Sequence, residues 1–204
     1  LHSDLKIMTT KTTKKTTKKF TVKALPDLPK NPLMFEILDL VSKQRSKAKK
    51  IEVLRKYDHT ALRSVLIWNF DESIISLLPE GEVPYVGYDE QNTYSGTLST
   101  KITAEVRRMH EKGSFSLGVT DSQGHTTIRR ESRHFYRFLK GGDPGLNAIR
   151  RETMFINILQ GLHPLEAEII CLIKDKTLDE KYKITKEVVS EAFPDIKWGG
   201  RGGQ

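Results

Sequence analysis

The sequence predicts a mainly α-helical protein: a compact multi-helix domain with a minor β-hairpin and a disordered, basic N-terminal arm. Apolar residues recur every three or four positions through most of residues 31–196, and capping residues precede several of these segments. The front of the chain is instead rich in lysine and threonine. We therefore expect a disordered arm and linker over 1–30, a single helical domain over 31–196 and a flexible glycine-rich tail over 197–204.

The N-terminal arm holds most of the positive charge. Residues 1–30 contain eight lysines and two aspartates, a net charge of +6, and the other 174 residues contribute only +2 to the formal total of +8. Residues 8–19, MTTKTTKKTTKK, offer nothing to bury after Met8, so this tract is expected to be disordered. Met8 is the expected first residue of the native chain, because native chains begin with Met and residues 1–7 lack a signal-peptide layout.

Three helices are expected in the first part of the domain. Asn31 and Pro32 form a helix start, with the asparagine as N-cap and the proline at the first helical position. A second helix covers about 46–57, and Asp58 is expected to cap a third. The apolar stripes of the first and third helices are Leu33, Ile37, Leu40 and Val41, and Leu62, Val65, Leu66 and Phe70. Two prolines and a glycine then place residues 78–85 in a loop.

The middle of the chain changes from a helical to an alternating period. Ser99 or Thr100 opens a helix that ends near Gly113. Apolar residues then alternate with polar or small ones, a turn follows, and residues 125–129 can return as a second strand. A minor hairpin is therefore expected at about 113–130, supported by the neighbouring helices because an isolated hairpin is only marginally stable.

Four further helices are expected in the last part of the domain. Helical patterning resumes near Glu131, and each later helix has its own capping residue. The caps are Asp143 followed by Pro144, His163 followed by Pro164, and Thr185. The helix after Pro144 is expected to bury a stripe that includes Ile149, Phe155, Ile156 and Leu159.

No pattern in the chain points to catalysis. The six histidines include no pair at metal-ligand spacing, the glycines at 141–145 lack the lysine of a P-loop, and neighbouring carboxylates diverge on a helix. We therefore expect no enzyme, no cofactor and no metal site. The single cysteine, Cys171, lies in an apolar stripe, which fits a reducing compartment. The longest apolar runs are far shorter than the roughly 20 residues needed to cross a bilayer, so no membrane partner is expected.

The candidate binding residues are cationic and point to nucleic acid. The arm lysines could lie along DNA or RNA by releasing counterions; they are Lys11, Lys14, Lys15, Lys18 and Lys19. Arg130, Arg133 and Arg137 are interleaved with aromatic residues, a mixture typical of single-strand binders. The same aromatic residues also fit a buried stripe, and the arm also fits a solubilising tail, so both interpretations stay open.

Three stretches carry a resemblance to a known family. They are NPLMFEILDLVSKQRSKAKKIEVLRKY (31–57), IWNFDESIISLLPEGEVPY (67–85) and HPLEAEIICLIKDKTLDEKYKITKEVVSEAFP (163–194), the last being the most specific. Together they resemble uncharacterised proteins of large contractile-tailed, T-even-like phages, chiefly marine cyanophages. The resemblance implies a phage protein made in the host bacterial cytoplasm, either free or virion-associated, and it transfers no catalytic residue.

Two functions follow as expectations, and an enzyme with an unfamiliar site stays open as a third. The first is a non-enzymatic phage accessory protein, a protein-binding or assembly module whose partner is another phage or host protein. The alternative is a sequence-nonspecific nucleic-acid-associated factor in phage replication, transcription or packaging, with the arm supplying salt-sensitive affinity. Deleting residues 8–19 separates the two, because the deletion abolishes most DNA affinity only under the alternative.

Overall fold

The structure is a computed structural model that describes residues 25, 27–85, 96–97, 104, 107 and 125–202. Over these residues the chain is mainly helical, as predicted. Its elements, in chain order, are α1 (Met34–Lys43), α2 (Lys47–Lys56), α3 (Thr60–Phe70), β1 (Pro84–Tyr85), β2 (Gly96–Thr97), α5 (Ile128–Glu131), the 3₁₀ helix η1 (Ser132–Phe138), α6 (Ala148–Gly161), α7 (Pro164–Lys174), α8 (Leu178–Lys181) and α9 (Lys186–Ala192). None of the helices in the described ranges is long and apolar enough to cross a membrane.

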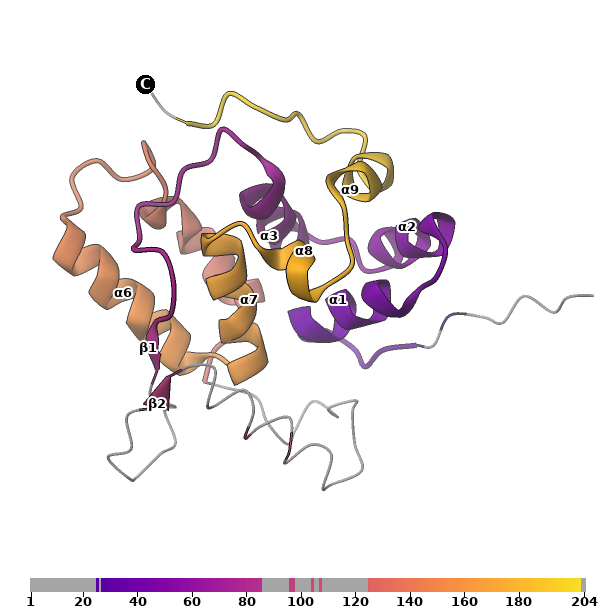
Figure 1. Cartoon of the computed structure of the whole chain (residues 1–204), viewed down its shortest axis with the longest axis horizontal. Coiled ribbons are helices and arrows are strands. Elements are labelled where there is room, and N and C mark those ends of the chain that lie inside the picture. Colours follow the sequence, from indigo (N-terminus) through magenta and orange to yellow (C-terminus); the bar gives the residue numbers. More distant parts are fainter. Residues whose placement is uncertain are drawn as a thin grey trace, which may run out of the picture.

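Helix α7 lies at the centre of the fold (Figure 1). It packs against α1 and α3 on one side and against α6 on the other, and α2 packs between α1 and α9. Most of the apolar side chains of α7 are buried, which agrees with a helix that has neighbours on several faces. Aromatic pairs join the layers around it: Trp68 meets Phe135 edge to face at 5.2 Å between ring centres, and Phe138 meets Phe155 at 5.3 Å.

Local capping explains where several helices begin. Side-chain oxygens of Ser46, Asn147 and Thr185 accept backbone N–H groups in the first turns of α2, α6 and α9. His163 is the N-cap of α7 and Pro164 is its first residue, as predicted. At these helices, the residue immediately before the first turn supplies the oxygen or ring nitrogen that accepts a backbone N–H of that turn.

Three predicted helix starts are wrong. Helix α1 begins at Met34, because the carboxylates of Glu36 and Glu166, rather than the Asn31 side chain, take its first N–H groups. The N-cap of α3 is His59, because both oxygens of Asp58 instead accept hydrogen bonds from Arg63. Helix α6 begins four residues after Pro144, at Ala148 with Asn147 as its N-cap.

The strand structure also differs from the prediction. The described strands are β1 and β2, which pair antiparallel with Pro84 opposite Thr97 and Tyr85 opposite Gly96. Of the hairpin predicted at about 113–130, residues 113–124 lie outside the described residues. The return strand over 125–129 is wrong, because α5 begins at Ile128, whose side chain is fully buried and whose N–H is bound by Glu166.

The predicted arm lies almost wholly outside the described residues. These residues include neither 1–24 nor the candidate lysines Lys11, Lys14, Lys15, Lys18 and Lys19. Of the helix expected from Ser99 or Thr100, the structure describes only Ala104 and Arg107, and both are helical. Disorder in the arm therefore stays a prediction.

Residues 198–201, which lie within the tail expected to be flexible over 197–204, form hydrogen bonds with the body of the protein. Trp198 donates its indole N–H to Ser190 on α9 at 3.0 Å, and the N–H of Gly199 donates to the carboxylate of Asp71 at 3.1 Å. Arg201 forms an ion pair with the same carboxylate. Gly199 and Gly200 have φ angles of 87° and 73°, a conformation that favours glycine, so the glycines allow the turn that brings Arg201 to Asp71.

Candidate interaction surface

The three candidate arginines lie on α5 and η1. Arg130 and Arg133 are exposed and Arg137 is partly exposed. In the same segment, Phe135 and Phe138 are buried in the core. The interpretation of these two aromatic residues as a buried stripe is therefore confirmed, and neither ring is available to stack on a nucleic-acid base.

Four large apolar side chains are exposed near η1. Ile149 is 80% exposed, Ile75 47%, Tyr136 45% and Leu77 38%, and among the described residues these are the exposed large hydrophobic residues. The prediction that Ile149 belongs to the buried stripe of its helix is wrong. Because α6 begins at Ala148, Ile149 stands in the first turn, and the buried stripe begins only at Phe155.

Hydrogen bonds join the segments that carry these apolar residues. The N–H of Leu77 donates to the Phe138 carbonyl, and the N–H of Lys140 donates to the Ile75 carbonyl, both at 2.8 Å. Between them, Ser76 turns inward and accepts the Trp68 indole N–H at 2.9 Å, so its two neighbours face outward.

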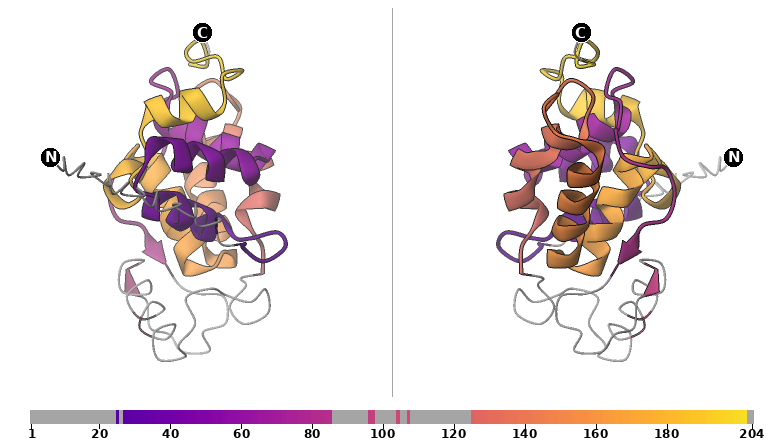
Figure 2. Two further views of the ribbon diagram at one scale, coloured as in Figure 1. Left: turned by 90° about the vertical axis from the view of Figure 1, so that its right-hand side faces the viewer. Right: turned by 90° about the vertical axis from the view of Figure 1, so that its left-hand side faces the viewer.

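The first turn of α6 lies against the same segment. Arg151 donates through Nε to the carbonyl of Arg137 at 3.2 Å and through Nη2 to that of Leu146 at 2.8 Å. Figure 2, in its right-hand view, shows α6 on the same side of the molecule as the segment that precedes it. We call Ile75, Leu77, Tyr136 and Ile149, with the cations Arg133, Arg137, Lys140 and Arg150, the η1 surface.

Positive charge gathers along this part of the chain. Residues 129–151 contain seven arginine and lysine residues and two acids, a net charge of +5, although residues 31–204 as a whole carry only +2. The overall near-neutrality of the body therefore conceals a basic segment. Among the described residues, the four cations of the η1 surface form no salt bridge; these are Arg133, Arg137, Lys140 and Arg150.

Two cations on α2 and α3 form salt bridges instead. Lys47 lies 2.6 Å from Glu187 and 2.5 Å from Glu191. Arg63 bonds both oxygens of Asp58 and reaches Asp195 at 2.6 Å. Lys47 and Arg63 are therefore neutralised within the chain, whereas the cations of the η1 surface form no salt bridge to another described residue.

A buried acidic centre lies where α1, α5 and α7 meet. The two carboxylate oxygens of Glu166 accept the N–H groups of Met34 at 2.9 Å and Ile128 at 3.1 Å. Burial raises the pKa of Glu166 to about 7, although these hydrogen bonds and the nearby Arg129 favour its charged form. Burial also raises the pKa of Glu36. Sequence inspection missed this pair, because 130 positions separate the two residues and no local pattern connects them.

The hydrogen bonds of this acidic centre give it a structural role. Each oxygen of Glu166 is occupied by the first N–H of a different helix, so the carboxylate joins α1 and α5 to α7. The neighbouring His163 accepts the N–H of Leu165 through Nδ1 and stacks on Phe35. The side chains of Glu166 and His163 therefore both accept backbone N–H groups at the beginnings of helices.

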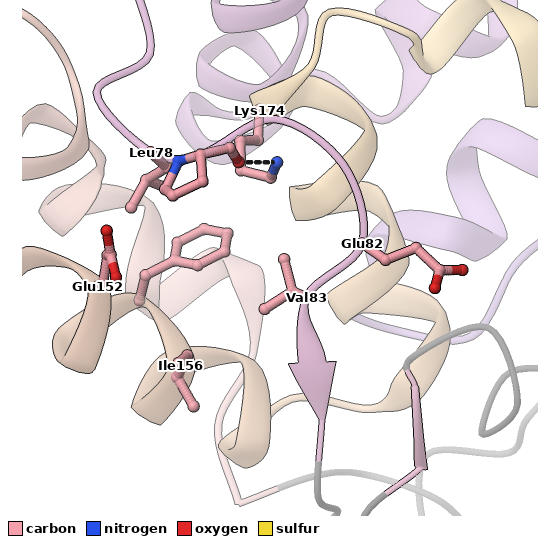
Figure 3. A pocket seen from close by; sticks show the side chains of 8 residues that line it. Leu78, Glu82, Val83, Glu152, Ile156 and Lys174 are labelled. Atoms are coloured by element: carbon pink, nitrogen blue, oxygen red, sulfur yellow. Dashed lines mark hydrogen bonds between the residues drawn. The ribbon is translucent and has the colours of Figure 1, made fainter.

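A small pocket opens between α6, α7 and the loop before β1 (Figure 3). Its volume is about 160 Å³. Its lining residues are Leu78, Pro79, Glu82, Val83, Glu152, Phe155, Ile156 and Lys174. The Lys174 ammonium group donates to the carbonyls of Pro79 at 2.6 Å and Gly81 at 3.2 Å, so it closes the loop over α7 (Figure 3). The pocket is mostly apolar and suits a small apolar group.

Other reactive groups are not assembled in the described part of the chain. No group of three or more His, Cys, Asp or Glu residues there could hold a metal ion. Burial raises the pKa of the Cys171 thiol to about 12, which keeps it protonated and unreactive at neutral pH.

These features define a small helical protein with an acidic structural centre and an unpaired basic and apolar surface. The chain belongs to a protein family of unknown function, DUF6433, whose sequence profile matches residues 37–121 and 116–180. No curated protein matches the chain, and no solved structure matches it either.

Proposed function

We propose that this chain is a phage accessory protein that acts without catalysis, as a protein-binding or assembly module in the host bacterial cytoplasm or in the virion. The resemblance of residues 31–57, 67–85 and 163–194 to phage proteins supports the source. Membership of a family of unknown function agrees with the proposal without naming a role. The η1 surface is the proposed contact with another phage or host protein.

The observation that carries the proposal is the exposure of Ile149. Ile149 is 80% exposed on the helix turn that Arg151 joins to the end of η1, and a partner that covered this side chain would remove it from water. Burying an isoleucine contributes about 1.5–3 kcal/mol, enough for one such residue to act as an anchor. The unpaired cations around it would form the polar rim of the contact.

Affinity capture from infected bacteria tests this proposal. Ile149→Asp places a charge at the centre of the proposed contact, and Ala48→Asp is the matched control, because both positions are exposed and stand second in a helix. We expect the tagged wild-type chain and Ala48→Asp to retain the same partner, identified by mass spectrometry, and Ile149→Asp to lose it. Equal retention by all three chains, or retention of nothing, contradicts the proposal.

Two further observations bear on origin and location. The position of the gene among phage genes tests the source, and a chromosomal gene with no phage neighbours would contradict it. Mass spectrometry of purified particles separates the two locations: the protein is present if it is part of the virion and absent if it acts only in the cytoplasm.

Nucleic-acid binding is the alternative function, favoured by the charge of +6 on residues 1–30 and by the absence of salt bridges to Arg130, Arg133 and Arg137 within the described chain. A filter-binding titration in salt tests it. Under this alternative, deleting residues 8–19 removes most DNA affinity and flattens the dependence on salt, because each released lysine contact contributes nearly one unit of slope. Unchanged affinity after the deletion excludes the arm as the binding element.

A further inference from the structure

We infer that the partner presents an acidic amphipathic segment to the η1 surface, with carboxylates for its arginines and apolar side chains for Ile149 and Leu77. This inference rests on the proposed function and names the chemistry of the partner. It follows from the kinds of side chain exposed, from the charge around them and from the way two arginines are held.

The exposed apolar side chains favour a protein over a nucleic acid. Ile75, Leu77 and Ile149 are aliphatic, and single-stranded nucleic acids are bound chiefly through stacking on aromatic rings. Phe135 and Phe138 are in the core, and the exposed ring of Tyr136 already lies against the Arg137 guanidinium, 5.5 Å from the ring centre. An occupant that removes the aliphatic groups from water must therefore bring apolar side chains of its own.

Charge determines the polar part of the occupant. The +5 of residues 129–151 is the net charge after Glu131 and Asp143 are subtracted, and among the described residues the four cations of the η1 surface form no salt bridge. Lys47 of α2 and Arg63 of α3, by contrast, have acidic partners within the chain. An acidic segment of the partner would supply the carboxylates that the η1 surface lacks, which guides association and excludes basic partners.

Two guanidinium groups are already oriented for carboxylates. Arg137 donates through Nε to the Tyr136 hydroxyl at 3.0 Å, and Arg133 donates through Nε to His134 Nε2 at 3.2 Å. Within the described chain neither arginine uses its terminal nitrogens in a hydrogen bond, so each presents two N–H donors side by side. Carboxylates match that fork in a bidentate arrangement, and the Nε contact reduces the entropy that binding would cost.

The full chain can be tested with designed peptides. The probe is a helical 18-residue peptide with leucine along one face and glutamate on the other, and the comparison peptide has glutamine in place of every glutamate. We expect the acidic peptide to bind on the order of tenfold more tightly at low salt, as two exposed arginine–carboxylate pairs would give. The preference should shrink as salt rises, because screening weakens exposed pairs.

Variants identify the groups responsible. The double variant Arg133→Gln, Arg137→Gln should remove the preference for the acidic peptide, and Arg133→Lys, Arg137→Lys should restore only part of it, because lysine keeps the charge without the fork. Ile149→Asp should weaken both peptides, and Ala48→Asp neither. Circular dichroism of each variant confirms that the fold is retained.

Several outcomes overturn the inference. These are equal binding of the two peptides, a preference that survives the glutamine double variant, binding of neither peptide, and complete displacement of the acidic peptide by oligo-dT of the same charge at the same concentration. If the capture experiment returns a partner that Ile149→Asp loses while the peptide preference is absent, the proposed function stands and the acidic segment is wrong.

Discussion

Glu166 on α7 accepts a hydrogen bond from the backbone N–H of Met34, 2.9 Å away and 132 positions earlier in the chain. Its second oxygen holds the N–H of Ile128 at 3.1 Å. One buried side chain therefore fixes the beginning of α1 and of α5 relative to the central helix. Since α5 leads directly into η1, this contact also positions the η1 surface.

Replacing Glu166 with alanine should destabilise the fold. The change leaves two buried N–H groups unpaired, at about 1–3 kcal/mol for each group, and opens space in the core. We expect a loss of roughly 2–4 kcal/mol in the free energy of unfolding, measured by urea denaturation at pH 7.5. Glu180→Ala on the exposed side of α8 is the control and should change stability by less than about 0.5 kcal/mol. Similar small effects in both variants would mean that Glu166 does not hold the helices.

Stability should also depend on the protonation of Glu166. Because burial raises its pKa in the folded protein from 4.5 to about 7, the folded state holds this proton more tightly than the unfolded state does. The stabilisation is fully present below about pH 4.5 and is lost as pH rises to about 7, by at most on the order of 3 kcal/mol. Arg129, which opposes the shift, and Glu36, which adds to it, are the charged groups nearby.

Denaturation across this pH range tests the assignment. The wild type should become less stable between pH 5 and pH 7, and Glu166→Gln, which cannot titrate, should show a flatter profile. A profile with the same slope in both chains would assign the dependence to another group, of which Glu36 is the first to examine because burial raises its pKa as well.

The anchored C-terminal segment gives a dependence of opposite sign. Burial raises the pKa of Asp71, but hydrogen bonds from Ser73, Gly199 and Arg201 outweigh that effect and hold it at about 2. The resulting stability is present above about pH 3.8 and is lost as pH falls through 2. At neutral pH, Asp71→Ala should cost about 2–4 kcal/mol, because the donors around it lose a buried acceptor.

Removing the tail separates its contribution from that of Asp71. A chain that ends at Lys197 keeps the two hydrogen bonds from Ser73 to Asp71 and loses those from Gly199 and Arg201. We expect it to lose roughly 1–2 kcal/mol, less than Asp71→Ala, in urea denaturation. A truncated chain as stable as the full chain would show that the contacts of Trp198 to Arg201 do not stabilise the fold.

The predictions from sequence succeeded where one local signal decides the structure. His163 with Pro164 and Thr185 begin α7 and α9 as expected, because each caps a turn only two or three residues away. Helical periodicity likewise identified the stripe of α3, whose Leu62, Val65 and Leu66 are buried. These features need no information from distant parts of the chain.

Two of the failures share a physical cause, which is a partner far away in sequence. The hairpin pattern predicted a return strand over 125–129, but Glu166 binds the N–H of Ile128 from 38 positions away and caps a helix there. The terminal glycines predicted a free tail, but Asp71, 130 positions before Arg201, holds it. Neither contact can be predicted from the local sequence pattern.

The η1 surface was predicted only in part. Arg133 and Arg137 stood out as cations in the sequence, but of the aromatic residues among them Phe135 and Phe138 are in the core and only Tyr136 is exposed. The exposure of Ile149 depends on where α6 begins, and that start lies four residues after the proline that suggested it. Summing charge over the whole body also concealed the +5 of residues 129–151.

The turn after η1 supplies a last prediction, because it determines the shape of the proposed contact. A Cβ added at Gly142 would lie 1.8 Å from the carbonyl oxygen of Tyr136 and 2.7 Å from its carbonyl carbon, and backbone atoms there cannot move aside without disturbing η1. Gly142→Ala should therefore destabilise the protein by more than about 2 kcal/mol or displace η1. Gly145→Ala is the matched control, since its nearest neighbour would be 4.0 Å away, and it should be nearly neutral. Both variants can be compared by thermal unfolding and by binding of the acidic peptide; if Gly142→Ala keeps wild-type values in both, the close packing of this turn against Tyr136 is wrong.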